Sequence, residues 1–238
     1  MNKPFYKKVS LYVILAVLLL LLATAWFLLD YFNIIPKKHY YAEDFGITVA
    51  KSQTDFDNDG IDDYADILLG ALKDAENKPK YDGKYIDGGY PPDNIGVCTD
   101  VVWRGFKNAG YSLRDMVDND ILSRPDAYPL IKKPDTNIDF RRVRNLRIFF
   151  DKYAQKLTTD INDIAEWLPG DIVIFNNEKH IGIVSDKRNS DGQVYIIHNG
   201  GQPNRDEDYF KRTDATVVAH YRFDASKMDK EILKPWKD

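Results

Sequence analysis

The one cysteine of the chain, Cys98, stands where a thiol could act as a nucleophile. It follows the turn-forming stretch 90–96, and apolar residues recur at helical spacing after it, at Val102 and Phe106. Cys98 is therefore predicted to open a short amphipathic helix that stops at Gly110. The unpaired N–H groups and the positive dipole end of a helix start favour an anion, and so can lower the pKa of a thiol.

Two considerations limit this interpretation of the cysteine. Asp100 lies close behind it in the sequence, and a nearby carboxylate disfavours a second negative charge. A buried, inert cysteine is the alternative, because free cysteines are common in protein cores. A single cysteine cannot form an intrachain disulfide, so the domain must be held together by its core alone. The local pattern leaves nucleophile and core residue both open.

Two of the four histidines could serve such a thiol. A thiol nucleophile needs a base within hydrogen-bond reach, and the base needs a group that orients it. His180 begins a predicted strand at 180–186, and His198 lies at the end of the next predicted strand, 194–199. If these strands pair as a hairpin, the two histidines lie close together at one end of the sheet. The other two histidines are weaker candidates, because one follows the apolar N-terminal segment and one sits in a later strand.

The elements that must position these residues are predicted to be helices in the first half of the domain and strands in the second half. Helical spacing predicts helices after residue 66, after Cys98 and over 139–155, whereas 111–137 contains many turn formers and is expected to be a loop-rich connection. Runs rich in Val, Ile, Tyr and Phe predict four strands, at 172–175, 180–186, 194–199 and 217–223. This order favours an α+β domain, with helices first and an antiparallel meander after them.

Four arginines gather on and beside the helix predicted at 139–155, at positions 141, 142, 144 and 147. They would ordinarily form a solvated face of that helix. The functional alternative is that one guanidinium binds a substrate carboxylate, because its planar geometry suits that partner. We take Arg142, and Asp100 beside the cysteine, as the candidate substrate-binding residues.

A short acidic segment at 55–66 has the spacing of a calcium-binding loop. Carboxylates alternate along it, Gly60 permits a sharp turn, and further aspartates follow. The candidate ligands are Asp55, Asp57, Asp59, the Ile61 carbonyl, Asp63 and Asp66. The segment departs from an EF-hand, because it ends on an aspartate rather than a glutamate, and it resembles a single thrombospondin type 3 repeat. A structural Ca²⁺ is predicted, with a solvated acidic turn that caps the next helix as the alternative.

An almost unbroken apolar run at 9–29 is long enough to span a bilayer as a helix. Lysines precede it, so the positive-inside rule predicts a cytoplasmic N-terminus and an extracytoplasmic remainder, although Lys37 and Lys38 weaken this bias. The alternative is a cleaved signal peptide with its cleavage site at 23–25. The run continues beyond that site through Trp26, which favours an uncleaved anchor in the cell membrane.

Composition and charge limit the function classes. The 238 residues carry a net charge of −4, which gives no case for nucleic-acid binding, and no organic cofactor is expected. The expected organisation is an N-terminus and anchor at 1–33, a linker at 34–54, one domain at 55–224 and a mixed-charge tail at 225–238.

Motifs across the domain resemble two families. A cysteine at a helix start, then the segment 170–175 and a histidine that opens the next strand at 180–183, are similar to the papain-like NlpC/p60 cell-wall cysteine peptidases. The cysteine motif departs from that pattern, because Val97-Cys98-Thr99 replaces the usual Asp-Cys-Ser. More closely, the segments 96–101, 139–146, 169–173, 180–181 and 198–199 resemble the bacterial DUF1287 family, a domain of unknown function.

The resemblance covers residues 50 to 224 and carries expectations about fold and activity. It implies a papain-like NlpC/p60-type fold with Cys98 as nucleophile, His180 as base, His198 as the orienting residue and Asn199 as its substitute. It also implies a cysteine peptidase or amidase that cleaves peptides of peptidoglycan by acyl transfer. The alternatives are a module that binds cell-wall peptides without cleaving them, and a Cys-dependent acyltransferase in which an amine replaces water.

Overall fold

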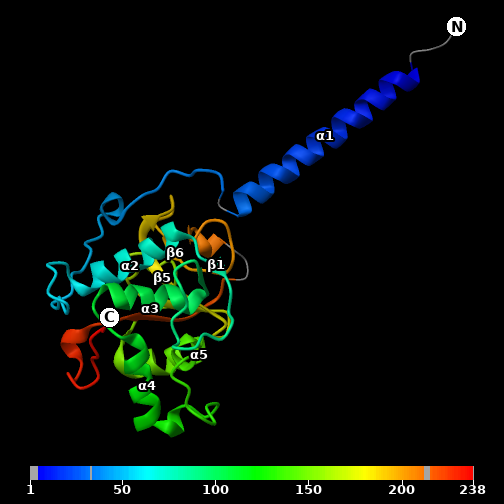
Figure 1. The fold of residues 1–238 in the computed structure, drawn as a ribbon. Coiled ribbons are helices and arrows are strands. Elements are labelled where there is room, and N and C mark those ends of the chain that lie inside the picture. Colours follow the sequence, from blue (N-terminus) through cyan, green and yellow to red (C-terminus); the bar gives the residue numbers. More distant parts are fainter. Residues whose placement is uncertain (1–4, 33, 212–214, 238) are drawn as a thin grey trace. The chain divides into compact units, whose positions relative to one another are not determined.

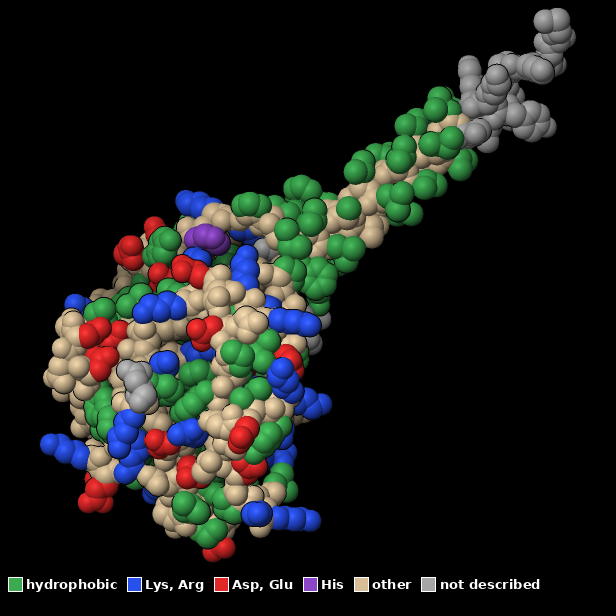
Figure 2. Space-filling model, in the orientation of Figure 1, with side chains coloured by type: hydrophobic (Ala, Val, Ile, Leu, Met, Phe, Trp, Pro, Cys, Tyr) green, Lys and Arg blue, Asp and Glu red, His purple; other side chains and the backbone are tan. Residues whose placement is uncertain are grey.

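A computed structural model describes residues 5–32, 34–211 and 215–237, and the chain divides into two compact units, 1–37 and 38–238. The first unit holds helix α1 (Phe5–Tyr31). Its segment Leu11–Tyr31 has a mean hydropathy of 2.7 and is long and apolar enough to cross a membrane. Apolar side chains cover this helix in Figure 2 and are exposed from Leu11 onward. By length and composition, α1 fits the predicted anchor.

The second unit is an α+β domain in which the helices precede most of the sheet (Figure 1). Its described α-helices are α2 (Asp63–Asn77), α3 (Cys98–Asn108), α4 (Leu113–Ser123) and α5 (Val143–Tyr153). Its strands are β1 (Lys80–Tyr81), β2 (Ile95–Gly96), β3 (Gln155–Lys156), β4 (Ile172–Phe175), β5 (His180–Arg188), β6 (Val194–Ile197), β7 (Asp206–Glu207) and β8 (Val217–Arg222). Short 3-10 turns are η1 (Ala42–Phe45), η2 (Pro125–Ala127), η3 (Asp139–Arg141), η4 (Tyr209–Lys211) and η5 (Ala225–Lys227). The predicted α+β class is confirmed.

The main sheet has the strand order β3-β8-β4-β5-β6-β7, and its pairings are antiparallel. Strands β4, β5 and β6 form the predicted meander, with Phe175 opposite His180 and Ile183 opposite Ile197. β8 pairs with β4, so the strand predicted at 217–223 returns to the other side of the meander instead of extending it after β6. A short parallel pair, β1 with β2, lies outside this sheet.

Both faces of the central strands are buried, because apolar side chains alternate into two cores. Ile172 and Ile174 of β4 join the core beneath the helices, whereas Val173 and Phe175 join a smaller cluster around Trp167. This explains why β4 reads as a continuous apolar run rather than as an alternating one.

Helices α2 and α3 run side by side (Figure 1), and α3 packs on β5. Two glycines permit this close approach of the helices. A Cβ on Gly70 would lie 2.6 Å from Cβ of Asn108, and one on Gly105 would lie 2.9 Å from the Ile67 carbonyl oxygen. The tight contact holds α3, and with it Cys98, firmly against the rest of the domain.

The structure differs from expectation after Gly110. The stretch expected as a loop-rich connection contains helix α4, which buries Met116, Val117 and Ile121 in the main core. The hydroxyl of Ser112 caps its start by accepting a hydrogen bond from the Asp115 N–H. The expectation was wrong because the polar residues between these apolar positions masked the helical period.

The remaining differences lie at two boundaries. The helix predicted at 139–155 is split into η3 and α5, because Arg142 between them is extended. The C-terminal residues, expected as a tail, pack on the domain: the ring of Trp236 stacks on Trp103 with centroids 6.1 Å apart, and the backbone N–H of Trp236 donates to the Gly110 carbonyl. Apolar burial therefore continues to Trp236.

Candidate active site

Cys98 is the first residue of α3, and the predicted helix start is confirmed. Burial raises the pKa of the Cys98 thiol to about 11. The backbone N–H groups of Ile181, Thr99 and Cys98 itself hydrogen bond to the sulfur and lower the pKa, but they offset only part of this rise. The N–H groups of the helix start thus lower the thiol pKa, as expected, but loss of solvent outweighs them, so the pKa is raised overall in the protein without substrate.

The two histidines singled out in the sequence meet at one end of the β5–β6 hairpin. His180 begins β5, and His198 directly follows β6. Nε2 of His180 lies 2.8 Å from Nδ1 of His198, and Nε2 of His198 lies 3.0 Å from Oε1 of Glu207. A hydrogen-bonded chain thus leads from His180 through His198 to a carboxylate. Ile181, the neighbour of His180, contacts the Cys98 sulfur through its N–H, so the backbone next to His180 lies against the thiol.

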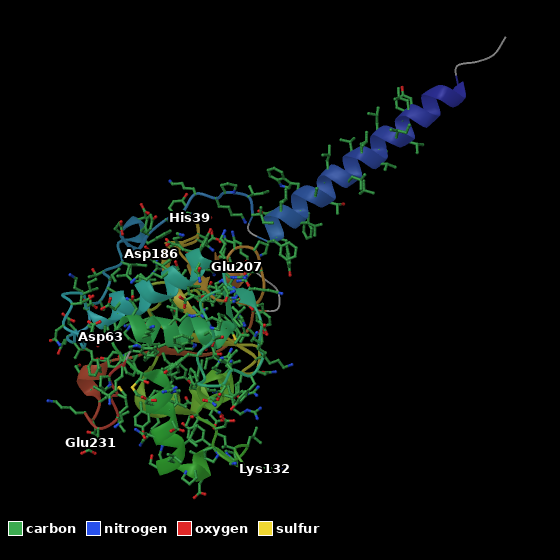
Figure 3. All side chains as sticks on the ribbon, viewed as in Figure 1. His39, Asp63, Lys132, Asp186, Glu207 and Glu231 are labelled. Atoms are coloured by element: carbon green, nitrogen blue, oxygen red, sulfur yellow. The ribbon has the colours of Figure 1, made fainter. Side chains whose placement is uncertain are left out.

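Glu207 is the residue of this chain that sequence reasoning missed. Its side chain is fully buried, and Figure 3 labels its position in the domain. In the sequence it is the middle of three acidic residues, 206–208, and nothing local distinguishes it from the other acidic residues. The antiparallel pairing of β7 with β6, which sets Glu207 opposite Ile196, brings it to the histidine.

An aromatic ring closes over the two imidazoles. The ring of Tyr209 lies 4.3 Å from that of His198 and 5.6 Å from that of His180, centroid to centroid. Phe175, opposite His180 in the sheet, adds a second apolar contact at 6.4 Å. This packing limits water at the histidine pair and restrains the orientation of both rings.

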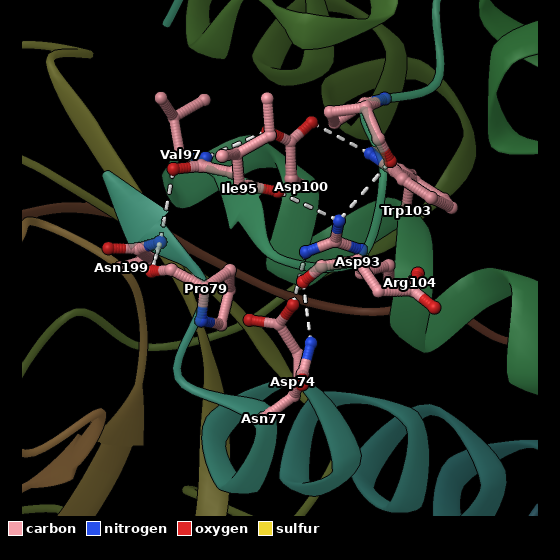
Figure 4. A network of polar contacts seen from close by, with 12 residues as sticks. Asp74, Asn77, Pro79, Asp93, Ile95, Val97, Asp100, Trp103, Arg104 and Asn199 are labelled. Carbon is pink, nitrogen blue, oxygen red and sulfur yellow. Dashed lines mark hydrogen bonds and ion pairs between the residues drawn. The ribbon is translucent and has the colours of Figure 1, made fainter. Parts of the chain in front are cut away.

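Asn199 holds the backbone beside the site and does not contact the His180 ring through any described hydrogen bond. Its amide Nδ2 donates to the carbonyl oxygens of Pro79 at 3.2 Å and Gly96 at 3.1 Å (Figure 4). Its oxygen accepts from the Gly201 N–H at 3.1 Å. The sequence proposed Asn199 as a substitute for His198. The structure places it as a brace between the end of β6 and the segment before Cys98, and His198 contacts His180.

Arg104 holds the same segment from the other side (Figure 4). Its guanidinium donates to the carbonyl oxygens of Ile95 at 3.0 Å and Pro92 at 3.2 Å, and it pairs with the buried carboxylate of Asp74 on α2. Arg104 is one helical turn and a half beyond Cys98 on α3, so it ties the chain that enters the helix to the helix itself. The position of the thiol is fixed by these contacts before any substrate binds.

Asp100 is fully buried and belongs to the support of α3. Its two oxygens accept from Nε and Nη2 of Arg141, both at 2.8 Å, and Oδ1 also accepts from Trp103 Nε1 at 2.8 Å. Oδ2 caps the helix start by accepting from the Val97 N–H at 2.7 Å. Asp100 was predicted from the sequence to bind substrate, but both of its carboxylate oxygens already accept hydrogen bonds from groups of the protein.

A cleft of about 930 Å³ opens at Cys98. Among the charged side chains of its lining, six basic residues outnumber three acidic ones: Lys132, Lys133, Arg141, Arg142, Arg144 and Lys179 against Asp135, Asp139 and Glu178. Arg141 is neutralised by Asp100, and Arg144 pairs with Glu178 at 3.1 Å. Within the described ranges, the side chains of Lys132, Lys133, Arg142 and Lys179 form no ion pair. The predicted binding residue Arg142 thus lines the cleft, and exposed Lys132 (Figure 3) adds charge at its rim.

The acidic loop brings together three of its six predicted ligands. Carboxylate oxygens of Asp55, Asp57 and Asp59 lie within 4.8 Å of one another. Asp66 lies near them: burial, followed by the charges of Asp59 and Asp57, raises its pKa to about 7. The Ile61 N–H donates to Asp59 at 2.9 Å.

Asp63, another predicted ligand, is directed into the fold. Its carboxylate accepts hydrogen bonds from the Tyr111 hydroxyl at 2.7 Å and from the Phe56 N–H at 3.0 Å, and it also binds the Thr54 hydroxyl. The contact with Tyr111 joins the start of α2 to the segment between α3 and α4. Asp63 therefore lies outside the group of three carboxylates that the structure brings together.

The fold and the site define an α+β domain in which a buried cysteine begins a helix, and a His–His–Glu chain starts at the residue before Ile181, whose N–H contacts the cysteine sulfur. The family profile described as "Domain of unknown function (DUF1287)" matches residues 68–223. The chain is also 36% identical over 167 residues to the "Uncharacterized protein YijF" of Escherichia coli (strain K12), across 66% of this chain and 80% of that protein. The protein belongs to the DUF1287 family, and the resemblance stated from its motifs is confirmed.

Proposed function

We propose that this protein is a membrane-anchored, extracytoplasmic thiol hydrolase that cleaves an amide bond. The observation that carries the proposal is the chain His180–His198–Glu207, whose first residue precedes Ile181, the residue whose N–H hydrogen bonds to the Cys98 sulfur. A nucleophile, a base, and groups that orient the base are the components of covalent acyl transfer by a thiol. A buried carboxylate behind two histidines is costly unless it is paired, which makes this arrangement unusual for a purely structural core.

The mechanism begins with a neutral thiol. Because burial raises the pKa of Cys98 to about 11, His180 takes the thiol proton as the sulfur attacks the amide carbonyl, rather than before substrate binds. The S–C bond forms while the carbonyl π electrons move to oxygen, and the Cys98 backbone N–H stabilises that oxyanion. The intermediate collapses as His180 returns the proton to the leaving amine. Water then releases the acyl group, with His180 again as base, and restores the thiol.

The substrate we propose is a peptide that carries free carboxylates, as the peptides of bacterial peptidoglycan do. The unpaired cations of the cleft support this choice, because the chain as a whole has a net charge of −4. Arg142 is the proposed carboxylate-binding residue, since its guanidinium lines the cleft with Cys98 and forms no ion pair within the described part of the chain.

Fold and location complete the proposal. We assign the domain to the papain-like NlpC/p60 type, because a helix that begins at the cysteine packs on an antiparallel strand that begins at the histidine. We assign α1 as an uncleaved anchor, with a cytoplasmic N-terminus and the domain outside. We also propose that Asp55, Asp57 and Asp59 hold a structural Ca²⁺, because three carboxylates this close repel one another without a cation.

One observation favours a second candidate function. The Cys98 side chain is only 6% exposed, and its raised pKa leaves it un-ionised at neutral pH, as expected for a thiol with no catalytic role. The same cleft would then bind acidic cell-wall peptides without cleaving them. Transfer of the acyl group to an amine instead of water is a variant of the first proposal, and the products distinguish the two.

The deciding experiment incubates the full chain, purified in detergent, with peptidoglycan and analyses the released fragments by mass spectrometry. Cleavage predicts new amine and carboxyl ends that appear with wild type and are absent with Cys98→Ala. Acyl transfer predicts products joined to an added amine. His39→Gln is the matched control, because His39 lies outside the chain of contacts at Cys98. Equal release by wild type and Cys98→Ala would refute the thiol mechanism, and binding without release would leave the second candidate.

A further inference from the structure

The Glu207 carboxylate determines which nitrogen of His198 carries hydrogen. Its Oε1 lies 3.0 Å from Nε2 of His198. The Glu207 side chain is fully buried, and the His198 side chain is 2% exposed. An ionised carboxylate only accepts hydrogen bonds, so Nε2 of His198 must be the donor. In a neutral imidazole the other nitrogen then has the lone pair. Nδ1 of His198 is therefore an acceptor.

The same reasoning applies to the imidazole ring of His180. Nδ1 of His198 lies 2.8 Å from Nε2 of His180, so the hydrogen of this bond belongs to His180 Nε2. A neutral His180 with hydrogen on Nε2 has its lone pair on Nδ1. That is the atom that must be basic if His180 is to take a proton from the thiol. The opposite tautomer would have N–H at Nδ1 and could not act as a base there.

Gln202 packs against the His198 ring and restrains its position. Its Oε1 accepts a hydrogen bond from the Gly200 N–H at 2.7 Å, which fixes its amide nitrogen toward His198. That nitrogen donates to the His198 carbonyl oxygen at 3.0 Å and lies 3.2 Å from each ring nitrogen. An amide nitrogen cannot accept a hydrogen bond. The amide nitrogen lies equally far from both ring nitrogens, so the tautomer of His198 is determined by Glu207 and not by Gln202.

We propose that Glu207 is a positioning residue that fixes the tautomers of His198 and His180 in sequence, so that Nδ1 of His180 is the proton acceptor. The usefulness of this arrangement for catalysis rests on the function proposed above, but the tautomer chain itself does not. Glu207 acts on His180 through His198, which its carboxylate contacts. It is comparable in role to a carboxylate that orients a single histidine in other nucleophilic enzymes.

The test is ¹⁵N NMR of the full chain in detergent micelles, labelled at histidine. With four histidines in the sequence, single substitutions assign each ring. In wild type at neutral pH, Nε2 of both His180 and His198 should give the signal of a protonated nitrogen, and Nδ1 of both the signal of an unprotonated one. In Glu207→Gln an amide that can donate or accept replaces the carboxylate, so both rings should become tautomer mixtures. Asp206→Asn, which removes a neighbouring carboxylate that pairs with Lys187, should leave the spectrum as in wild type.

Glu207→Asp keeps the charge and should retain the wild-type tautomers, which separates positioning from general disruption of the fold. Hydrogen on Nδ1 of His180 in wild type would overturn the inference, and so would unchanged tautomers in a folded Glu207→Gln. If the proposed hydrolysis is observed, Glu207→Gln should also reduce kcat by about 100- to 10 000-fold with little change in KM. Tautomers as expected, without any Cys98-dependent cleavage, would refute the hydrolase and leave this inference intact.

Discussion

Nε2 of His180 lies 2.8 Å from Nδ1 of His198, although 18 positions separate the two residues in the sequence. The contact depends on the register of the β5–β6 hairpin, in which Ile183 is opposite Ile197 and Val184 opposite Ile196. A slip of one residue would turn His198 to the other face of the sheet and break the chain to Glu207. The buried apolar residues of both strands hold this register, so the core and the site are specified together.

The raised pKa of Cys98 predicts a steep pH dependence of its reaction with an alkylating reagent. The thiolate is the reactive form, and burial places the pKa at about 11. The rate with iodoacetamide should therefore rise about tenfold per pH unit from neutral pH upward, until the pH approaches the pKa. Mass spectrometry of the quenched protein gives the rate. A plateau that begins near or below pH 8 would contradict this expectation and indicate a preformed thiolate–imidazolium pair.

The buried pair of Asp100 and Arg141 predicts a large stability effect from removing one partner. Arg141→Gln leaves a fully buried carboxylate without its main cation, which should lower the free energy of unfolding by about 3–5 kcal/mol. The double variant with Asp100→Asn should recover part of that loss. Urea unfolding of the full chain in detergent measures both.

Arg144→Gln is the control for the buried pair, because Arg144 forms a more exposed pair with Glu178 and should change stability by about 1 kcal/mol or less. Equal losses for the buried and the exposed arginine would show that Asp100 does not depend on its partner. The comparison separates a structural role of Asp100 from the substrate contact inferred from sequence.

The parts of the fold that sequence patterns predicted are those specified by local apolar periodicity. The run 172–175 was predicted as a strand with the bounds that the structure has, and the helix start at Cys98 follows from the change of period there. The meeting of His180 and His198 could be inferred because both lie at the ends of adjacent strands. Each inference needed one segment, or two neighbouring ones, and no knowledge of distant contacts.

The parts that were missed depend on contacts between distant segments. Glu207 reaches His198 only through pairing of β7, a strand of two residues with no apolar pattern. Arg141 and Asp100 are 41 positions apart. Arginine and aspartate are mostly exposed in proteins, so the sequence does not indicate that these two are buried. The net rise of the thiol pKa could not be predicted for the same reason. The helix start is a local feature, whereas the burial that outweighs it comes from packing against β5.

The cationic cleft predicts a role for Arg142 in binding an acidic peptide. Loss of one charge-assisted hydrogen bond costs about 1.5–3 kcal/mol, so Arg142→Gln should raise KM about 10- to 100-fold for a substrate with a carboxylate. For an amidated version of the same peptide, KM should change little. Lys51→Gln, an exposed change in the segment before α2, is the matched control. Equal effects of Arg142→Gln on both peptides would exclude a carboxylate contact.

The acidic loop predicts stabilisation by Ca²⁺. A cation that binds the folded loop and not the unfolded chain raises stability by RT ln(1 + [L]/Kd), which is about 2.7 kcal/mol at a hundredfold excess over Kd. The Tm of wild type should therefore rise with added Ca²⁺, and less with Mg²⁺, which favours a smaller and more regular site.

Asp57→Asn keeps the size of the side chain but removes one of the three clustered charges, and should abolish most of the rise. Asp126→Asn, in η2, should keep it. A Tm that does not respond to Ca²⁺ in wild type, or that rises equally in Asp57→Asn, would mean that the loop is a solvated acidic turn, stabilised by the hydrogen bonds that its N–H groups donate to Asp55 and Asp59.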